Sequence, residues 1–74
     1  MDDQPTTLWT LERDDRALAC TATLVPYGIE INLIVDGAAV VTRVFETGDE
    51  ALAWAAKKRG DREAAGWKEK TAGE

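Results

Sequence analysis

The chain has 74 residues, 31% of them charged, and a formal net charge of −5, which suits one small soluble domain spanning 1–74. One cysteine and no histidine or serine exclude an intrachain disulfide and disfavour a zinc site or Ser–His catalysis. Neither a leader peptide nor an apolar run of about 20 residues is evident, so we expect a cytoplasmic protein. Ordered residues are expected at about 6–67, with polar tails at 1–5 and 68–74.

Alternating apolar and polar residues predict three strands in the first half of the chain, at 7–13, 16–25 and 29–35. Turns at Asp14-Asp15 and around Pro26-Tyr27 would pair consecutive strands antiparallel. Because proline cannot supply a positive φ, a turn wider than two residues is an alternative at this position. Any widening by an even number of residues keeps the same faces together.

The clearest local signal is Asp36-Gly37, which precedes a fourth predicted strand at 38–45. Asp-Gly between alternating apolar residues predicts a two-residue hairpin, since both turn residues must accept positive φ. Extending this pairing outward places Leu33 opposite Val40. All three turns then agree on one inner face of the sheet. This face is formed by Trp9, Leu11, Leu18, Cys20, Ala22, Leu24, Ile29, Ile31, Leu33, Val35, Val40 and Val44.

A helix is predicted after the last strand, from Asp49 to Ala65. It begins at a capping box, in which Thr47 caps the free amides and Glu50 reaches back. Gly66 and Trp67 predict its end, with Gly66 in the left-handed region and Trp67 folded back as an apolar contact. The inner stripe of the helix is expected to be Ala51, Leu52, Ala55 and Arg59, flanked by Trp54 and Ala56.

The predicted fold is α+β: a four-stranded antiparallel meander, in the order 1-2-3-4, with one C-terminal helix packed on one face. Trp9, Trp54 and Trp67 are expected to fill the seam between helix and sheet, since large rings compensate for small alanines. The opposite face of the sheet has no cover within the predicted elements. Its candidate interaction residues are Leu8, Ile34, Val41, Arg43 and Phe45.

Charge is distributed unevenly along the chain. Residues 1–46 carry three basic and eight acidic side chains, which sum to −5, whereas residues 47–74 carry six of each. Four of these basic residues crowd one stretch of the helix: Lys57, Lys58, Arg59 and Arg62. Such a cluster is typical of a solvated helix face, and the alternative is a contact to an anion or to nucleic acid.

Residues able to carry out catalysis are scarce. Cys20 has inner-face parity and is expected to be a small buried apolar side chain rather than a reactive thiol. The acidic pairs Asp14-Asp15 and Asp49-Glu50 are explained by a turn and by a helix start. The glycines stand alone, so no phosphate-binding loop is present in the sequence. We therefore expect no enzyme, no cofactor and no metal site.

A tryptophan near the start, a turn like Val35-Asp36-Gly37, and a helix with Ala51-Leu52-Ala53-Trp54-Ala55 that ends at Gly66-Trp67 occur together in this chain. With these elements it resembles, over about residues 8–67, a group of small bacterial ββββα proteins of unassigned role. This resemblance implies a bacterial cytoplasmic protein and carries over no site residue. The order of elements is also similar, in topology alone, to the unit of PUR-type and Whirly-type single-strand binders.

The predicted function is a non-enzymatic protein-interaction module that associates with itself, as a homodimer, or with another protein through the uncovered face of the sheet. The alternative is a single-stranded nucleic-acid-binding domain that uses the helix cations. The acidic net charge argues against nucleic acid and against an anionic membrane as partners.

Overall fold

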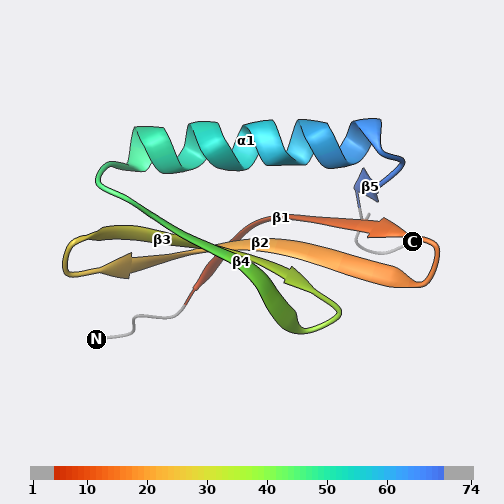
Figure 1. Ribbon diagram of the computed structural model, residues 1–74, viewed down its shortest axis with the longest axis horizontal. Coiled ribbons are helices and arrows are strands. Elements are labelled where there is room, and N and C mark those ends of the chain that lie inside the picture. Colours follow the sequence, from red (N-terminus) through yellow and green to blue (C-terminus); the bar gives the residue numbers. More distant parts are fainter. Residues whose placement is uncertain (1–4, 70–74) are drawn as a thin grey trace.

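A computed structural model describes residues 5–69 as five strands and one helix. They are β1 (Thr6–Arg13), β2 (Arg16–Val25), β3 (Gly28–Val35), β4 (Ala38–Phe45), α1 (Gly48–Ala64) and β5 (Lys68–Glu69). The strands form one antiparallel sheet in the order β4-β3-β2-β1-β5, and α1 runs across one of its faces (Figure 1). The prediction of an α+β fold built on a four-strand meander is confirmed.

The short fifth strand was not predicted. Lys68 and Glu69 pair with Glu12 and Leu11 of β1, although the sequence placed both in a polar tail. The expectations for residues 1–4 and 70–74 lie outside the described residues.

The first three connections are two-residue turns, because their flanking residues pair directly. Asp36 and Gly37 have φ of 51° and 87°, as the Asp-Gly hairpin requires. The Pro26-Tyr27 turn also holds two residues, and the glycine after it, Gly28, has a φ of 151°. A Cβ at Gly28 would collide with the carbonyl oxygen of Phe45. Glycine at this position therefore allows the backbones of β3 and β4 to approach closely.

Asp36 also fastens the β3–β4 turn to the start of β2. Its carboxylate accepts hydrogen bonds from the backbone N–H of Ala17 (2.9 Å) and from Nε of Arg16 (3.1 Å). Its own backbone N–H donates to the carbonyl oxygen of Ala17 (2.9 Å). These bonds to the charged form lower the pKa of the Asp36 carboxyl, the Ala17 bond contributing most.

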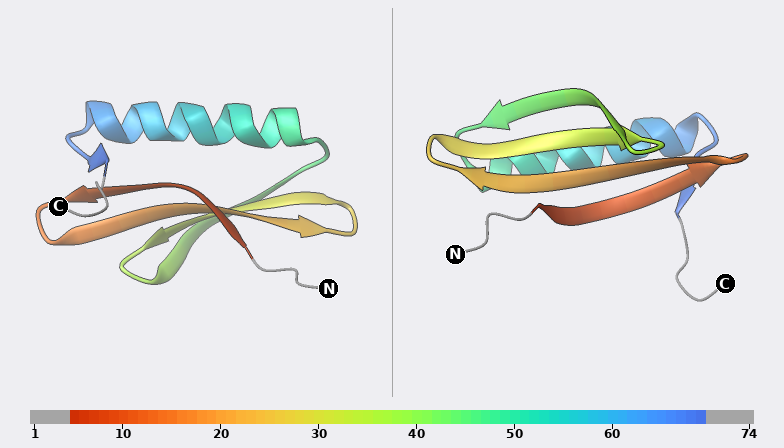
Figure 2. Two further views of the ribbon diagram at one scale, coloured as in Figure 1. Left: turned by 180° about the vertical axis from the view of Figure 1, so that it is seen from behind. Right: turned by 90° about the horizontal axis from the view of Figure 1, so that it is seen from below.

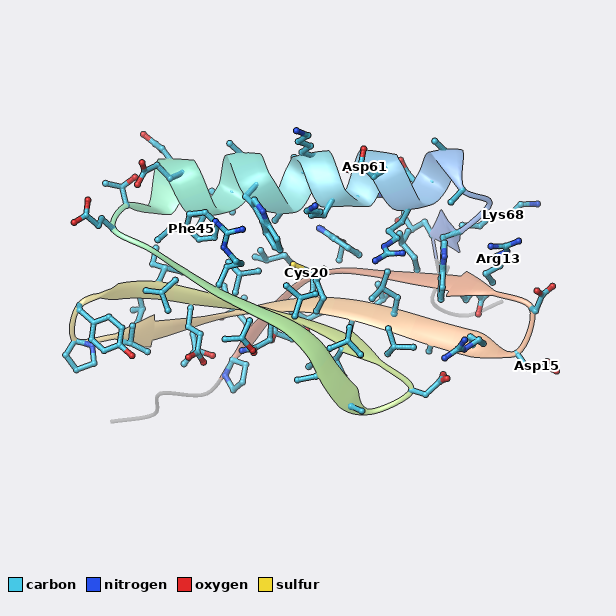
Figure 3. All side chains as sticks on the ribbon, viewed as in Figure 1. Arg13, Asp15, Cys20, Phe45, Asp61 and Lys68 are labelled. Atoms are coloured by element: carbon cyan, nitrogen blue, oxygen red, sulfur yellow. The ribbon has the colours of Figure 1, made fainter. Side chains whose placement is uncertain are left out.

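The core lies between the sheet and the helix, and Figure 3 shows Cys20 in this layer. Three strands supply most of it, and the helix adds two alanines. Its buried residues are Trp9, Leu11, Leu18, Cys20, Ile31, Leu33, Ala51 and Ala55. Trp54 and Trp67 pack against this cluster, as the sequence predicted. The inner-face assignment is thus confirmed for β1, for the first half of β2 and for β3.

In β4 the predicted register is wrong beyond its second residue. Ile34 pairs with Ala39, but Leu33 pairs with Val41, so Val40 is an extra residue in a β-bulge. A one-residue shift exchanges the two faces of everything that follows. The predicted inner residues Val40 and Val44 are consequently 56% and 42% exposed.

Two leucines also depart from their predicted places. Leu24 has inner-face parity but is 74% exposed, near the end of β2. Leu52 is 56% exposed, because α1 turns Ala51 and Ala55 toward the sheet instead. The observed inner stripe follows the 3.6-residue helical period. It consists of Ala51, Trp54, Ala55, Lys58, Arg59 and Arg62, which are all buried or partly buried.

The ends of α1 follow the sequence signals closely. The N–H of Glu50 donates to Oγ1 of the N-cap residue Thr47 (3.2 Å). The reciprocal contact runs from the Thr47 hydroxyl to Oε1 of Glu50 (3.4 Å) rather than to the Thr47 backbone. At the other end, Trp67 N–H bonds to Arg62 O and Gly66 N–H to Glu63 O, with Gly66 at a φ of 103°. This is the Schellman motif, so the predicted helix stop is confirmed.

Candidate interaction surfaces

One face of the sheet carries no covering layer in the described part of the chain. The right-hand view of Figure 2 shows this face, with α1 behind the strands. We call it the uncovered face; it consists of Ala17, Ala19, Thr21, Thr23, Glu30, Asn32, Ile34, Ala39, Thr42 and Val44, of which Thr21 is itself buried (7% exposed). Cross-strand pairing arranges these residues in rows that run across β2, β3 and β4.

Two adjacent rows of the uncovered face differ in chemistry. The first is apolar, with Ala19 beside Ile34 and Ile34 beside Ala39. The second is polar: it runs through Thr21, Asn32 and Thr42. Here the Thr42 hydroxyl donates to Oδ1 of Asn32 (2.6 Å), and Nδ2 of Asn32 donates to Oε1 of Glu30 (3.3 Å). One hydrogen bond therefore joins two members of the polar row, and a second connects Asn32 to Glu30 in the next row.

Register shifts in β4 and in β1 move most of the predicted interaction residues off this face. Val41, Arg43 and Phe45 pair with the inward residues of β3, so they lie on the helix side, and their assignment to the uncovered face is wrong. Leu8 stands at a second register shift, in β1, and packs against the core. Of the five predicted residues, only Ile34 lies on the uncovered face.

The four helix cations do not form one free surface. Nε of Arg59 bonds to Oε2 of Glu63 (3.2 Å) and its Nη2 to Oε1 of Glu69 in β5 (2.6 Å). The bond to Glu63 contributes most to raising the pKa of Arg59. Lys58 lies against Trp54, Arg62 is partly buried, and of the four only Lys57 is exposed. The predicted anion contact therefore loses Arg59, which holds α1 to β5.

A different group of cations and rings meets beside the edge of β4. The guanidinium Cζ of Arg43 lies 5.8 Å from the ring centroids of both Phe45 and Trp54. The two rings are 5.7 Å apart and tilted by 47°. Nζ of Lys58 lies 5.4 Å from the Trp54 ring. We call Arg43, Phe45, Trp54 and Lys58 the Trp54 cluster. Figure 3 shows Phe45 below the first half of α1.

Within residues 5–69, no carboxylate lies within ion-pair distance of Arg43 or Lys58. Their charges are instead set against aromatic faces, a cation–π arrangement. Part of this cluster could be found in the sequence: Trp54 and Lys58 have helical i,i+4 spacing, and Arg43 and Phe45 share one face of a strand. The bulge at Val40 concealed which face.

Within residues 5–69, the groups suited to catalysis do not come together. Cys20 is buried, and burial raises the pKa of its thiol to about 11, so the thiol is protonated at neutral pH. In the described part of the chain, no three His, Cys, Asp or Glu side chains could hold a metal ion together.

An open depression of about 360 Å³ lies at the β1–β2 turn. Its lining consists of Glu12, Arg13, Asp14, Gly66 and Lys68. Figure 3 shows Arg13 and Lys68 at this end of the molecule. The two acidic and two basic side chains of the lining balance, so the depression has no net charge to attract an ion.

Comparison with protein-family models, with curated proteins and with solved structures finds no match. The helix of the described chain is too short and too polar to cross a membrane. Two surfaces of residues 5–69 combine exposure with an organised chemistry: the uncovered face and the Trp54 cluster.

Proposed function

We propose that the chain is a non-enzymatic, cytoplasmic protein-interaction module that binds a second protein surface, its own copy or another protein, through the uncovered face. The observation that carries this proposal is the apolar row of Ala19, Ile34 and Ala39 on a face without a covering layer. Val44, which is 42% exposed, adds a further apolar side chain to the same face on the far side of the polar row.

An antiparallel sheet can keep one face in water, so absence of cover is not enough by itself. The hydrogen bonding of the polar row adds a physical reason. Because the Thr42 hydroxyl already bonds to Asn32, a partner that covers this pair leaves fewer polar atoms unpaired than it would over two free side chains. Burial of the adjacent apolar row would then contribute roughly 25 cal/mol for each Å² removed from water.

The test places charges in the apolar row without disturbing the core. In Ala19→Lys/Ile34→Glu the new side chains lie directly opposite each other and can pair, so the fold should be retained. Sedimentation at micromolar to millimolar concentration should show association of the wild type and a monomeric double variant. Leu52→Glu, on the exposed side of α1, is the matched control and should associate like the wild type. If the wild type is monomeric, cross-linking in cells must capture a protein that the double variant fails to capture; otherwise the proposal fails.

A second candidate, single-stranded nucleic-acid binding, has one observation in its favour. Single-strand binders combine aromatic platforms with nearby cations, and the Trp54 cluster has both. The net charge of −5 opposes it. An oligonucleotide titration decides: binding that weakens steeply as salt rises supports this candidate, and no binding at low salt removes it.

A further inference from the structure

We infer that the edge of β4 binds an extended peptide segment carrying one acidic side chain. The segment would pair with residues 41–45 as an additional strand and place its carboxylate beside Arg43 and Lys58. This site differs from the uncovered face, with which it shares only Thr42 and Val44, because it uses the backbone edge of the sheet and the side that faces α1. Either proposal can therefore fail alone.

The backbone of β4 is the first observation. β4 ends the sheet on its side, whereas the opposite edge strand, β1, is partly covered by β5. Every residue of β4 is exposed or partly buried. Edge strands present unpaired N–H and C=O groups that a peptide can use. The bulge at Val40 interrupts this edge, so the regular stretch open to pairing is 41–45.

Charge is the second observation. Arg43 is the one charged residue of β4, and it stands in the middle of 41–45. Lys58 reaches the same Trp54 ring from α1, and neither cation has a carboxylate partner within residues 5–69. On a chain of net charge −5, this is a local site of positive charge. Both cations lie against aromatic rings, Lys58 is partly buried, and the exposed Arg43 remains open to an anion.

The register of β4 then sets the sequence that would fit. A peptide residue directly opposite Arg43 points to the same side of the sheet, with Cβ atoms about 5 Å apart. Residues two positions before and after it lie beside Val41 and Phe45, so apolar side chains fit there. The intervening residues lie beside Thr42 and Val44, on the other side. The inferred ligand has the pattern apolar-x-acidic-x-apolar, which is the same read in either strand direction.

The test uses a fluorescent peptide with Val-Thr-Glu-Thr-Val between glycine-serine flanks, titrated with the full chain and followed by polarisation. The same peptide with Lys in place of Glu should bind about tenfold more weakly, because attraction to Arg43 becomes repulsion. Arg43→Glu should reverse this preference, and circular dichroism verifies that the variant is folded. Lys57→Glu, an equal charge change at an exposed helix position outside the cluster, should leave the preference unchanged.

Edge pairing makes its own prediction. Bound peptide should slow amide hydrogen exchange in 41–45, and a peptide methylated at its backbone nitrogens should not bind. Equal binding of the Glu and Lys peptides, unchanged exchange in β4, or full binding by the methylated peptide would each overturn the inference. Displacement of the peptide by a single-stranded oligonucleotide and by no other competitor would also overturn the inference. A stable dimer in which β4 of one copy pairs with β4 of the other would do the same. Ala19→Lys/Ile34→Glu should bind the peptide as the wild type does, which separates this site from the uncovered face.

Discussion

The indole Nε1 of Trp9 donates a hydrogen bond to the carbonyl oxygen of Ala55, 3.2 Å away and 46 positions along the chain. It joins β1 to the middle of α1 within the buried core. Ala55 presents only a methyl group, so the large ring opposite it fills the space between the layers. The contact satisfies the indole N–H in a place that water does not reach.

Trp9→Phe should lower the free energy of unfolding by about 1 kcal/mol from the lost hydrogen bond, plus a smaller amount from lost ring area. Urea unfolding followed by circular dichroism measures the change. Trp67→Phe is the matched control, since the Trp67 indole makes no hydrogen bond within residues 5–69. Equal losses in the two variants would show that the bond to Ala55 contributes nothing.

Leu33→Ala should lower the free energy of unfolding by about 2–5 kcal/mol, because Leu33 is 1% exposed and its removal leaves a cavity. Leu24→Ala changes the same residue type in the neighbouring strand at a position that is 74% exposed. Its effect should stay within about 0.5 kcal/mol. Thermal unfolding of both variants tests the assignment, which fails if the two melting temperatures fall together.

Two glycine-to-alanine variants should act in opposite directions. Gly28→Ala should destabilise strongly, since its φ of 151° is strained for alanine and its Cβ meets the Phe45 carbonyl. At Gly60, inside α1, a Cβ has open space, so Gly60→Ala should stabilise by about 0.5–1 kcal/mol. Denaturant midpoints give the sign of each change. A stable Gly28→Ala protein would contradict the close approach of β3 and β4.

Cys20 should react slowly with a thiol reagent in the native protein and rapidly in denaturant. Burial raises its pKa to about 11, so both access and thiolate are lacking at pH 7. Mass spectrometry of labelled protein over time gives the rates. Rapid labelling under native conditions, at a rate that urea does not increase, would show that the thiol is exposed.

Asp36 should contribute to acid sensitivity. Its pKa is lower in the folded state than in the unfolded chain, so the unfolded chain binds its proton first as the pH falls. The stabilisation is fully present above about pH 4, the ordinary pKa of an aspartate in the unfolded chain. It is lost as the pH falls through the lower pKa that Asp36 has in the folded state. Asp36→Asn accepts the same positive φ but removes the charge, so stability should depend less on pH in this window.

The control for this pH series is Asp61→Asn. Asp61 is exposed on the side of α1 away from the sheet (Figure 3) and has no ion pair in the described chain. Chemical unfolding from pH 2 to 6 should give parallel curves for Asp61→Asn and the wild type. A flattened curve for both variants would assign the acid sensitivity to general charge rather than to Asp36.

The sequence predicted the three turns and the pairing of β1, β2 and β3 because each turn has a local signal and each strand alternates. It could not place the β4 bulge, since residues 38–41 are all apolar and satisfy either parity. The close approach of Gly28 and Phe45 involves residues far apart in the chain, and no local pattern reports it. The predicted interaction surface failed at the same point, because three of its residues follow Val40.

The sequence also could not predict which side of α1 faces the sheet. Its alanines fit several orientations almost equally, so the choice between Leu52 and Trp54 as the inward residue depends on rings supplied by other elements. The ion pairing of Arg59 could not be predicted from the sequence either. Its bond to Glu69 depends on β5, a strand of two residues that carries no periodic signal of its own.

The connectivity of the sheet has a consequence for how quickly the chain folds. Each of the strands β1 to β4 pairs with its neighbour in the chain across a two-residue turn, so three hairpins can form by short local searches. Docking α1 through Trp9 and Ala55 closes a much longer loop and should come later. Changes at the Asp36-Gly37 turn are then expected to slow folding, whereas loss of the Trp9 contact should mainly accelerate unfolding.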